Sequence, residues 1–217
     1  MVRTCTRSWS ACPGQDLQSA LDLKCTFSVA QVVDMALEVA ECLRWASRRK
    51  FVHRDLKPGN LLLCADGHVK LLDLGLAREV GPGKGVSLTK TGEGLGTPDF
   101  LAPEQYRDAK RVDCRADIFA LGATMYALLA GNAPLNPEAE QGARQGAETA
   151  ERDLLEPEPR PLREVKPEVS RRLSGVVRKC MRRAPSGRYA DFAELLKALQ
   201  GVKASLGANA ALGRGRG

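Results

Sequence analysis

Two stretches within the first fifty residues have apolar positions at the three- and four-residue spacing of amphipathic helices. The first is short and begins after Asp16, a residue type that favours the N-cap position. The second runs from Ser28 to about Arg49, and Ser28 with Gln31 three residues later has the pattern of a capping box. We therefore expect two helices here, the longer of which packs one face on a core.

A different pattern follows near residue 60, where two short apolar runs surround a glycine-containing turn. The runs are residues 61–64 and 69–72, and Ala65-Asp66-Gly67 separates them. This spacing predicts a β-hairpin. Asn60 immediately precedes the first strand and Asp73 follows the second, so the hairpin brings these two polar residues to the same end.

Helical spacing returns in the second half of the chain. Residues 117–130 are apolar on nearly every side and are followed by Gly131, which predicts a buried helix with a glycine after its end. Two amphipathic helices are expected at about 168–181 and 189–200. The Pro-, Glu- and Gly-rich stretch before them is predicted to be irregular, apart from one short helix at about 139–155. The predicted fold is α+β and predominantly helical, with one small hairpin.

Three segments show neither helical nor strand periodicity. We expect residues 1–12 to be disordered or foreign to the fold, residues 81–96 to form a mobile loop, and residues 201–217 to be a disordered tail. One folded domain is therefore expected, covering residues 13–200.

Composition agrees with one globular domain, because 43% of the 217 residues are hydrophobic and 27% are charged. No run approaches the roughly 18 apolar residues that a membrane-spanning helix needs, so we expect a cytoplasmic protein without a membrane span. The seven cysteines are scattered without a C-x-x-C pair, which predicts reduced thiols and neither a zinc site nor a disulfide framework.

The formal net charge of +7 raises the question of nucleic-acid binding. The basic residues cluster within the helix predicted at about 168–181, where Leu173, Val176 and Val177 occur at helical spacing. The charges therefore fit the exposed face of a packed helix, and we expect no nucleic-acid partner.

The densest group of chemically useful side chains lies in the sequence VHRDLKPGNLLL at residues 52–63. Asp55 is suited to accept the proton of a hydroxyl group, and Lys57 to neutralise anionic charge. Asn60 and Asp73 offer hard oxygen ligands of the kind that Mg²⁺ prefers. A base, a cation and a metal ligand on one short loop indicate phosphoryl transfer.

This loop resembles the H-R-D-L-x-x-x-N catalytic loop of protein kinases. Further segments resemble the same family in the required order. Asp73-Leu74-Gly75 resembles the D-F-G motif with leucine in place of phenylalanine, residues 96–104 resemble the end of an activation segment, and Asp117 with its helix resembles the central helix of the large lobe. A lysine at the position of Lys57 resembles the serine/threonine branch of the family. The sequences of these motifs are similar to those of bacterial serine/threonine kinases of the eukaryotic-like type.

The resemblance implies a kinase-like fold over roughly residues 13–200, ATP and Mg²⁺ as cofactors, and Ser or Thr hydroxyls of a protein as acceptors. It implies Asp55 as the catalytic base, Lys57 beside the γ-phosphoryl group, and Asn60 and Asp73 as metal ligands. It also implies supporting roles for neighbouring residues: Leu62 in the floor beneath the adenine, His53 and Leu74 under the site, and Thr97 in contact with Asp55 and Lys57.

Regulatory and structural positions also follow from the resemblance. Thr89 and Thr91 form a T-x-T pair where activation loops of similar kinases are phosphorylated, and Arg54 is placed to pair with such a phosphate. Glu104 is expected to form a buried ion pair with Arg188, which would tie the end of the activation segment to the loop before the last helix.

The sequence departs from the family before the catalytic loop. A glycine-rich loop and a lysine of the V-A-I-K type should precede that loop, yet only 54 residues precede Asp55 and none carries this pattern. We therefore expect the C-terminal lobe alone, with an apolar floor left for the missing N-terminal lobe or a partner chain to cover.

Two interpretations follow from this departure. The chain is either a truncated or frame-shifted kinase fragment that is inactive by itself, or a stand-alone lobe that acts as a non-catalytic binding or scaffold module. Retention of Asp55, Asn60 and Asp73 together favours the first. A third interpretation, an unrelated basic helical adaptor, requires the kinase motifs to be accidental.

Overall fold

The computed structural model describes residues 14–72, 78–79, 98–107, 112–134 and 159–213. Its α-helices are α1 (Leu17–Asp22), α2 (Val29–Ser47), α3 (Pro103–Arg107), α4 (Cys114–Ala130), α6 (Leu162–Val165), α7 (Arg171–Cys180) and α8 (Phe192–Gly213). Three short 3₁₀ helices are η2 (Pro58–Asn60), η4 (Pro98–Phe100) and η5 (Pro185–Gly187). The strands are β1 (Gln15–Asp16), β2 (Phe51–Val52), β3 (Leu61–Leu63), β4 (Val69–Leu71) and β5 (Arg78–Glu79).

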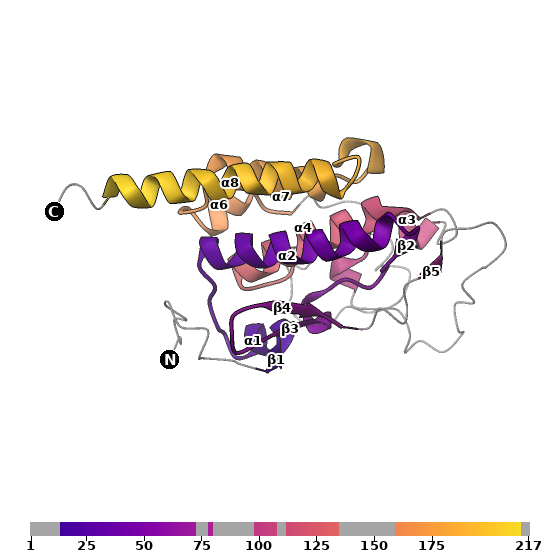
Figure 1. The fold of residues 1–217 in the computed structure, drawn as a ribbon, viewed down its shortest axis with the longest axis horizontal. Coiled ribbons are helices and arrows are strands. Elements are labelled where there is room, and N and C mark those ends of the chain that lie inside the picture. The colour runs from indigo at the N-terminus through magenta and orange to yellow at the C-terminus, as the bar shows by residue number, and fades with distance from the viewer. Residues whose placement is uncertain (1–13, 73–77, 80–97, 108–111, 135–158, 214–217) are drawn as a thin grey trace.

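These elements form layers (Figure 1). Helices α6, α7 and α8 lie on one side, α2 and α4 lie in the middle, and α1 with strands β1, β3 and β4 lies on the other side. Helix α2 packs against both α4 and α8, and α4 packs against α7. The middle layer therefore separates the outer helices from the small sheet, and one continuous core joins all three layers.

Helix α4 is the centre of this core, because every residue from 116 to 129 is buried. Gly122 permits its close approach to α7: a Cβ at this position would lie 2.5 Å from the Cβ of Cys180. The helix ends at Gly131 in the left-handed conformation, with φ 82°, as the sequence predicts. Its start was predicted too late, at Asp117, because Asp113 is the N-cap and accepts a hydrogen bond from the Arg115 N–H.

The predicted hairpin is confirmed as β3 and β4, which pair antiparallel with Leu61 opposite Leu71. Gly67 has φ 90° in the turn between them. The sequence did not predict β1, which extends the hairpin to a three-stranded sheet in the order β1-β3-β4. It also missed the antiparallel pair of β2 and β5. Strands of two residues are too short to show a period of two, so only their pairing identifies them.

Local capping signals placed the first two helices correctly. The Asp16 side chain accepts a hydrogen bond from the Ser19 N–H at the start of α1. At the start of α2, Ser28 and Gln31 form both hydrogen bonds of a capping box. Each cap satisfies an N–H that would otherwise have no partner within the helix.

The last two helices differ from their predicted bounds. Helix α7 begins three residues later than predicted because the Ser170 hydroxyl caps it by accepting from the Leu173 N–H. Helix α8 continues to Gly213, so the predicted disordered tail is wrong for residues 201–213. Val202 is 1% exposed and Leu206 packs on the core, which extends the apolar stripe beyond the predicted end.

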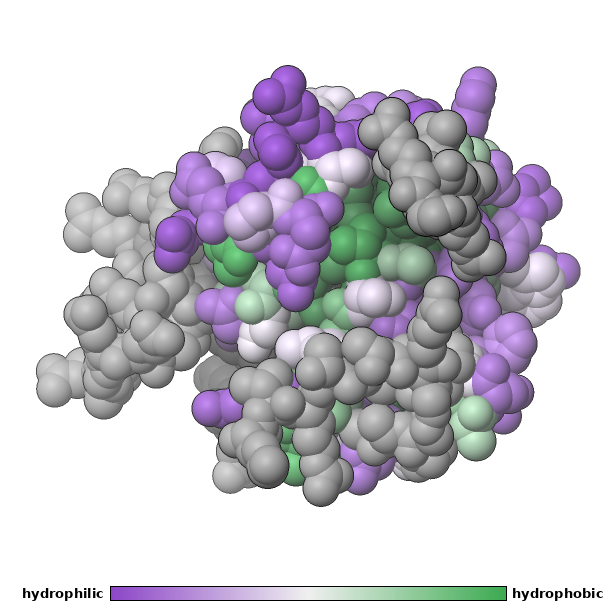
Figure 2. Space-filling view, turned by 90° about the vertical axis from the view of Figure 1, so that its left-hand side faces the viewer, coloured by the Kyte–Doolittle hydropathy of each residue, from purple (hydrophilic) through white to green (hydrophobic). Residues whose placement is uncertain are grey.

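Three segments singled out from the sequence lie outside the described residues: 1–12, 81–96 and the helix predicted at 139–155. Figure 2 shows the face at the left-hand side of Figure 1, where apolar side chains lie at the centre and hydrophilic side chains lie around them. Within the described ranges, no helix combines the length and apolar content that crossing a bilayer requires. The five cysteines in these ranges are free thiols.

Candidate active site

The loop between β2 and η2 is held by Asp117 of α4. The two Asp117 carboxylate oxygens accept hydrogen bonds from the backbone N–H groups of His53 and Arg54, both at 2.8 Å. Burial raises the pKa of this carboxyl, and the two N–H donors act in the opposite direction. Asp117 thus fixes the backbone immediately before Asp55 from inside the central helix.

Arg54 has the left-handed backbone conformation, with φ 67°. This region is unfavourable for a residue with a Cβ, so the surrounding structure must stabilise it. Asp117 accepts from the Arg54 N–H, and Gln105 of α3 donates from Nε2 to the Arg54 carbonyl at 2.9 Å. Gln105 also accepts from the Ala102 N–H at 3.1 Å, which joins the loop to the segment that resembles the end of an activation segment.

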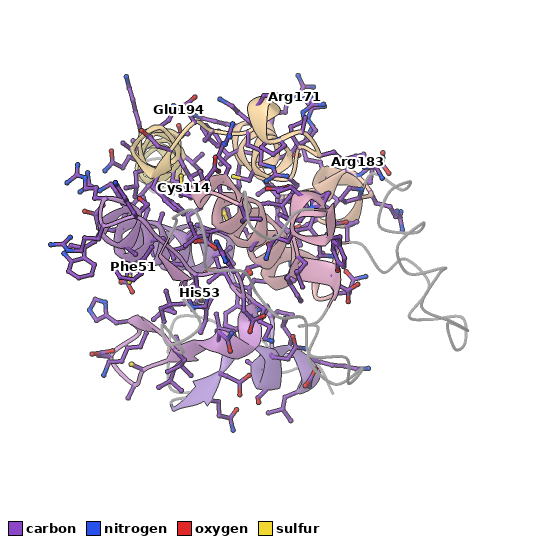
Figure 3. The ribbon with its side chains drawn as sticks, turned by 90° about the vertical axis from the view of Figure 1, so that its right-hand side faces the viewer. Phe51, His53, Cys114, Arg171, Arg183 and Glu194 are labelled. Atoms are coloured by element: carbon purple, nitrogen blue, oxygen red, sulfur yellow. The ribbon has the colours of Figure 1, made fainter. Side chains whose placement is uncertain are left out.

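The buried His53 ring lies between the loop and the end of the hairpin and contacts both. It is 1% exposed and lies where the helices meet the small sheet (Figure 3). Its Nδ1 lies 3.4 Å from the Asp55 N–H and its Nε2 lies 3.2 Å from the Leu72 carbonyl. The neutral tautomer with the proton on Nε2 satisfies both contacts, because Nδ1 then accepts and Nε2 donates. The expected role of His53 under the site stays a prediction.

The predicted catalytic side chains meet at Asp55. Lys57 Nζ lies 3.1 Å from Asp55 Oδ2, and Asn60 Nδ2 donates to the same oxygen at 3.0 Å. Asn60 Nδ2 also donates to the Asp55 carbonyl at 2.7 Å. The side chains of Lys57 and Asp55 remain 24% and 23% exposed. The carboxylate is therefore oriented by two donors and still reaches solvent.

The hairpin leads from this group to Leu72, the last described residue before Asp73 in the sequence. Asn60 ends η2, and its carbonyl accepts from the Leu72 N–H at 2.8 Å, so the two ends of the hairpin meet. Leu62 of β3 is partly buried. Several predicted site residues lie outside the described part of the chain: Asp73, Leu74, Gly75, Thr89, Thr91 and Thr97. Their predicted roles stay predictions.

The predicted pair of Glu104 and Arg188 is present. Arg188 Nη1 lies 2.6 Å from Glu104 Oε1, and Nη2 lies 2.7 Å from Oε2, so the contact is bidentate. The Arg188 side chain is fully buried. Its guanidinium also donates to the backbone carbonyls of Arg115, Arg182 and Arg183.

Gln105 is the residue at this site that sequence reasoning missed. It follows Glu104 directly, so its place in the motif was a possible signal. One of its hydrogen bonds is local, to the Ala102 N–H, but the other depends on the distant backbone of Arg54. In the described ranges, no group of three His, Cys, Asp or Glu side chains is arranged to hold a metal ion.

Comparison with known proteins identifies the family of this chain. The family profile described as protein kinase domain matches residues 8–199. The serine/threonine-protein kinase Pkn1 of Myxococcus xanthus is 38% identical over 176 residues, which are 78% of this chain and 24% of that protein. A probable serine/threonine-protein kinase of Streptomyces coelicolor is 30% identical over 193 residues, 85% of this chain and 27% of that protein. This chain belongs to the protein kinase domain family.

The kinase domain seen here spans about a quarter of the length of these curated relatives. The serine/threonine-protein kinase PknB of Mycobacterium leprae is similar too, with 30% identity over 165 residues and 25% of its length covered. The match from residue 8 includes part of the leader that was predicted to be foreign to the fold. Within the kinase domain, residues 53–60 are the segment on which the candidate chemistry converges.

Proposed function

We propose that this chain is the catalytic lobe of a serine/threonine protein kinase, which transfers the γ-phosphoryl group of ATP to Ser or Thr hydroxyls of a protein. The observation that carries the proposal is the Asp55 carboxylate, oriented by Lys57 and Asn60 while still reaching solvent. The names of the relatives support the acceptor class.

Asp55 acts as the base in this proposal. Its carboxylate accepts the proton of the substrate hydroxyl and orients the oxygen for in-line attack on phosphorus. Lys57 lies against the same carboxylate, where its ammonium group reduces negative charge at the transferring phosphoryl group. The hydrogen bonds from the His53 and Arg54 N–H groups to Asp117 hold the backbone immediately before the base.

Of the two residues proposed to hold Mg²⁺, one lies in the described part of the chain, and its side chain suits the metal. Asn60 uses its Nδ2 for both contacts with Asp55, which leaves Oδ1 as a hard oxygen ligand. The second proposed ligand is Asp73, next to Leu72 at the end of the hairpin. When bound, Mg²⁺ supplies positive charge that offsets charge on the phosphates.

We also propose that the chain works as the C-terminal lobe and needs a second lobe for full activity. Every strand in the described ranges belongs to a sheet of two or three strands. Neither a G-x-G-x-x-G loop nor a lysine of the V-A-I-K type occurs in the sequence before Asp55. The triphosphate would stay largely solvated on this lobe. We expect Mg·ATP to bind more weakly than about 1 mM.

Phosphorylation of Thr89 or Thr91 is the proposed activating step. A phosphate there would accept charge-assisted hydrogen bonds from Arg54, whose backbone α3 and α4 already hold in place. Phosphopeptide mapping of active enzyme should find at least one of the two threonines modified. If both are unmodified, or only Ser87 is modified, the assignment fails.

The test of the proposed function compares the 217-residue chain with a version that carries a kinase small lobe upstream. The grafted form should transfer phosphate to Ser or Thr, and Asp55→Asn should reduce the rate by roughly 10²–10⁴-fold. Asp66→Asn, on the exposed hairpin turn, is the matched control and should leave the transfer rate unchanged.

Calorimetry should find weak Mg·ATP binding to the bare chain. Micromolar binding would show that one lobe suffices, and a grafted form without transfer would favour a binding module.

A further inference from the structure

A cavity of about 350 Å³ lies between α3, α4, α6 and α7. This volume is within the range of small binding pockets. An aliphatic or aromatic side chain of a ligand can lose contact with water there, because the cavity has an apolar wall. Buried side chains from three helices form this wall: Phe119, Tyr126, Leu162, Val177 and Met181.

Exposed arginines surround the apolar wall. Six of them line the cavity: Arg160, Arg163, Arg171, Arg178, Arg182 and Arg183. Figure 3 shows Arg171 and Arg183 in the outer helical layer, away from His53. No aspartate or glutamate is among the described residues of the lining. A cavity with apolar walls and charge of one sign concentrates ions of the opposite sign, so this cavity should attract anionic groups.

The charges at the cavity differ from those of other arginines in the chain. Arg44, Arg115 and Arg188 each pair with a carboxylate. Of the arginines at the cavity, Arg171 and Arg178 belong to none of the ion pairs between described residues. Their guanidinium donors are therefore not used by a carboxylate within the described part of the chain, and a ligand can bind them.

Gly175 of α7 lines the same cavity. Glycine is an unfavourable residue in the interior of a helix. Packing explains Gly122 of α4, because a Cβ there would lie 2.5 Å from the Cβ of Cys180, whereas a Cβ at Gly175 would meet no described atom within 4 Å. Without a side chain at Gly175 the wall stays open, and a bound segment can come close to the α7 backbone.

We propose that the cavity binds an acidic segment of a partner protein, which inserts one apolar or aromatic side chain while neighbouring carboxylates contact the arginines. Guanidinium groups suit this role because their planar donors bind a carboxylate in pairs. A small inorganic anion would leave the apolar wall uncovered, so a peptide with both kinds of group fits better. The proposal goes beyond phosphoryl transfer, since neither Asp55 nor Lys57 lines the cavity.

Binding of short labelled peptides to the full chain without ATP tests this proposal. The probe has one phenylalanine between glutamates. One control peptide has glutamine in place of glutamate, and the other has serine in place of phenylalanine. We expect each replacement to weaken binding by about tenfold or more, and added salt to weaken binding of the probe.

Three results would overturn the proposal. The first is the absence of measurable probe binding, and the second is equal binding of the probe and either control peptide. The third is tighter binding of a single-stranded oligonucleotide of the same charge, which would assign the arginines to nucleic acid.

Variants assign the binding to the cavity. Arg178→Gln with Arg182→Gln should weaken probe binding by about tenfold or more at an unchanged melting temperature. Arg172→Gln with Arg48→Gln removes the same charge from exposed residues outside the lining and should keep the full affinity. Arg172 is a matched control in α7, because its Nη1 lies 3.2 Å from Ser205 Oγ of α8. Equal affinities of the two double variants would reject the cavity.

Gly175→Leu tests the cavity without a change of charge. It should weaken probe binding because its side chain occupies space at the wall, while α7 becomes no less stable since leucine favours a helix more than glycine. Full affinity of this variant would contradict insertion at the cavity. Probe binding that occurs only after the acidic residues of 148–158 are replaced by uncharged ones would assign the cavity to the chain itself and overturn the partner protein.

Discussion

Two ion pairs in this kinase domain join the same types of charge but differ in their surroundings. Arg188 meets Glu104 with its side chain fully buried, and its guanidinium also donates to three backbone carbonyls. Lys57 meets Asp55 at 3.1 Å with both side chains about a quarter exposed. The buried arginine has every donor direction occupied by the protein, whereas the Asp55 carboxylate still faces solvent.

This difference separates a contact that holds the fold from one that is available for chemistry. A buried charge that loses its partner is costly because water cannot replace that partner. A pair that remains about a quarter exposed loses less when it is broken, since solvent screens its attraction. Stability and phosphoryl transfer should therefore respond to different substitutions.

The largest effect on stability is expected for Arg188→Ala. It removes both bonds to Glu104 and leaves the carbonyls of residues 115, 182 and 183 without their donor, so unfolding should become easier by about 3–5 kcal/mol. Arg183→Ala, in an exposed side chain of the same loop, is the control and should change stability little. Chemical denaturation of both variants measures the difference, and equal midpoints would contradict this account of the buried pair.

A smaller loss is expected for Asp117→Asn. The His53 and Arg54 N–H groups bond to different Asp117 oxygens, and the amide replaces one of these oxygens with an NH₂ donor. One buried N–H then faces a donor and loses its acceptor, which costs about 1–3 kcal/mol. Hydrogen exchange should accelerate at those two amides. Thr124→Val in the same helix is the contrast, because the buried Thr124 hydroxyl has no hydrogen-bond partner within the described structure. Thr124→Val should leave the stability unchanged or increase it. Similar losses of stability in Thr124→Val and Asp117→Asn would contradict the assignment of the Asp117→Asn loss to the two N–H groups.

Lys57→Ala should change the free energy of unfolding by less than about 1 kcal/mol, as for other exposed ion pairs. In the enzyme with a grafted small lobe it should nevertheless lower the rate of phosphoryl transfer. Denaturation and rate measurements on one preparation separate the two effects. A stability loss as large as that of Arg188→Ala would show that the site pair is structural.

The smallest effect concerns His68, which contacts Glu38 on the exposed side of the hairpin at 2.7 Å. The hydrogen bond that this carboxylate accepts from the His68 ring raises the pKa of His68 above its ordinary 6.5. The contact therefore stabilises the fold at pH values below 6.5, and its contribution is lost as the pH rises through the raised pKa. Titration by NMR should show a lower His68 pKa in Glu38→Gln. An unchanged His68 pKa in this variant would show that Glu38 is not the cause of the raised value.

Much of the fold and site was predictable because the signals are local. The caps at Asp16 and Ser28, the hairpin around Gly67 and the catalytic loop are each encoded within a few consecutive residues. Contact of Asp55 with Lys57 and Asn60 follows from their closeness in one loop. The distant pair of Glu104 and Arg188 was predicted only through the family resemblance.

Other features depend on contacts between segments far apart in the chain. The left-handed conformation of Arg54 exists because Asp117 and Gln105 hold its two peptide groups, and no local pattern predicts that conformation at an arginine. Strand β1 is defined by pairing with β3, and α8 continues past residue 200 because Val202 packs into the core. The sequence by itself thus predicted the hairpin, the residues of the candidate catalytic loop, and five of the helices: α1, α2, α4, α7 and α8. Tertiary packing decided the backbone geometry of the loop, since hydrogen bonds across 50 or more residues require the assembled core.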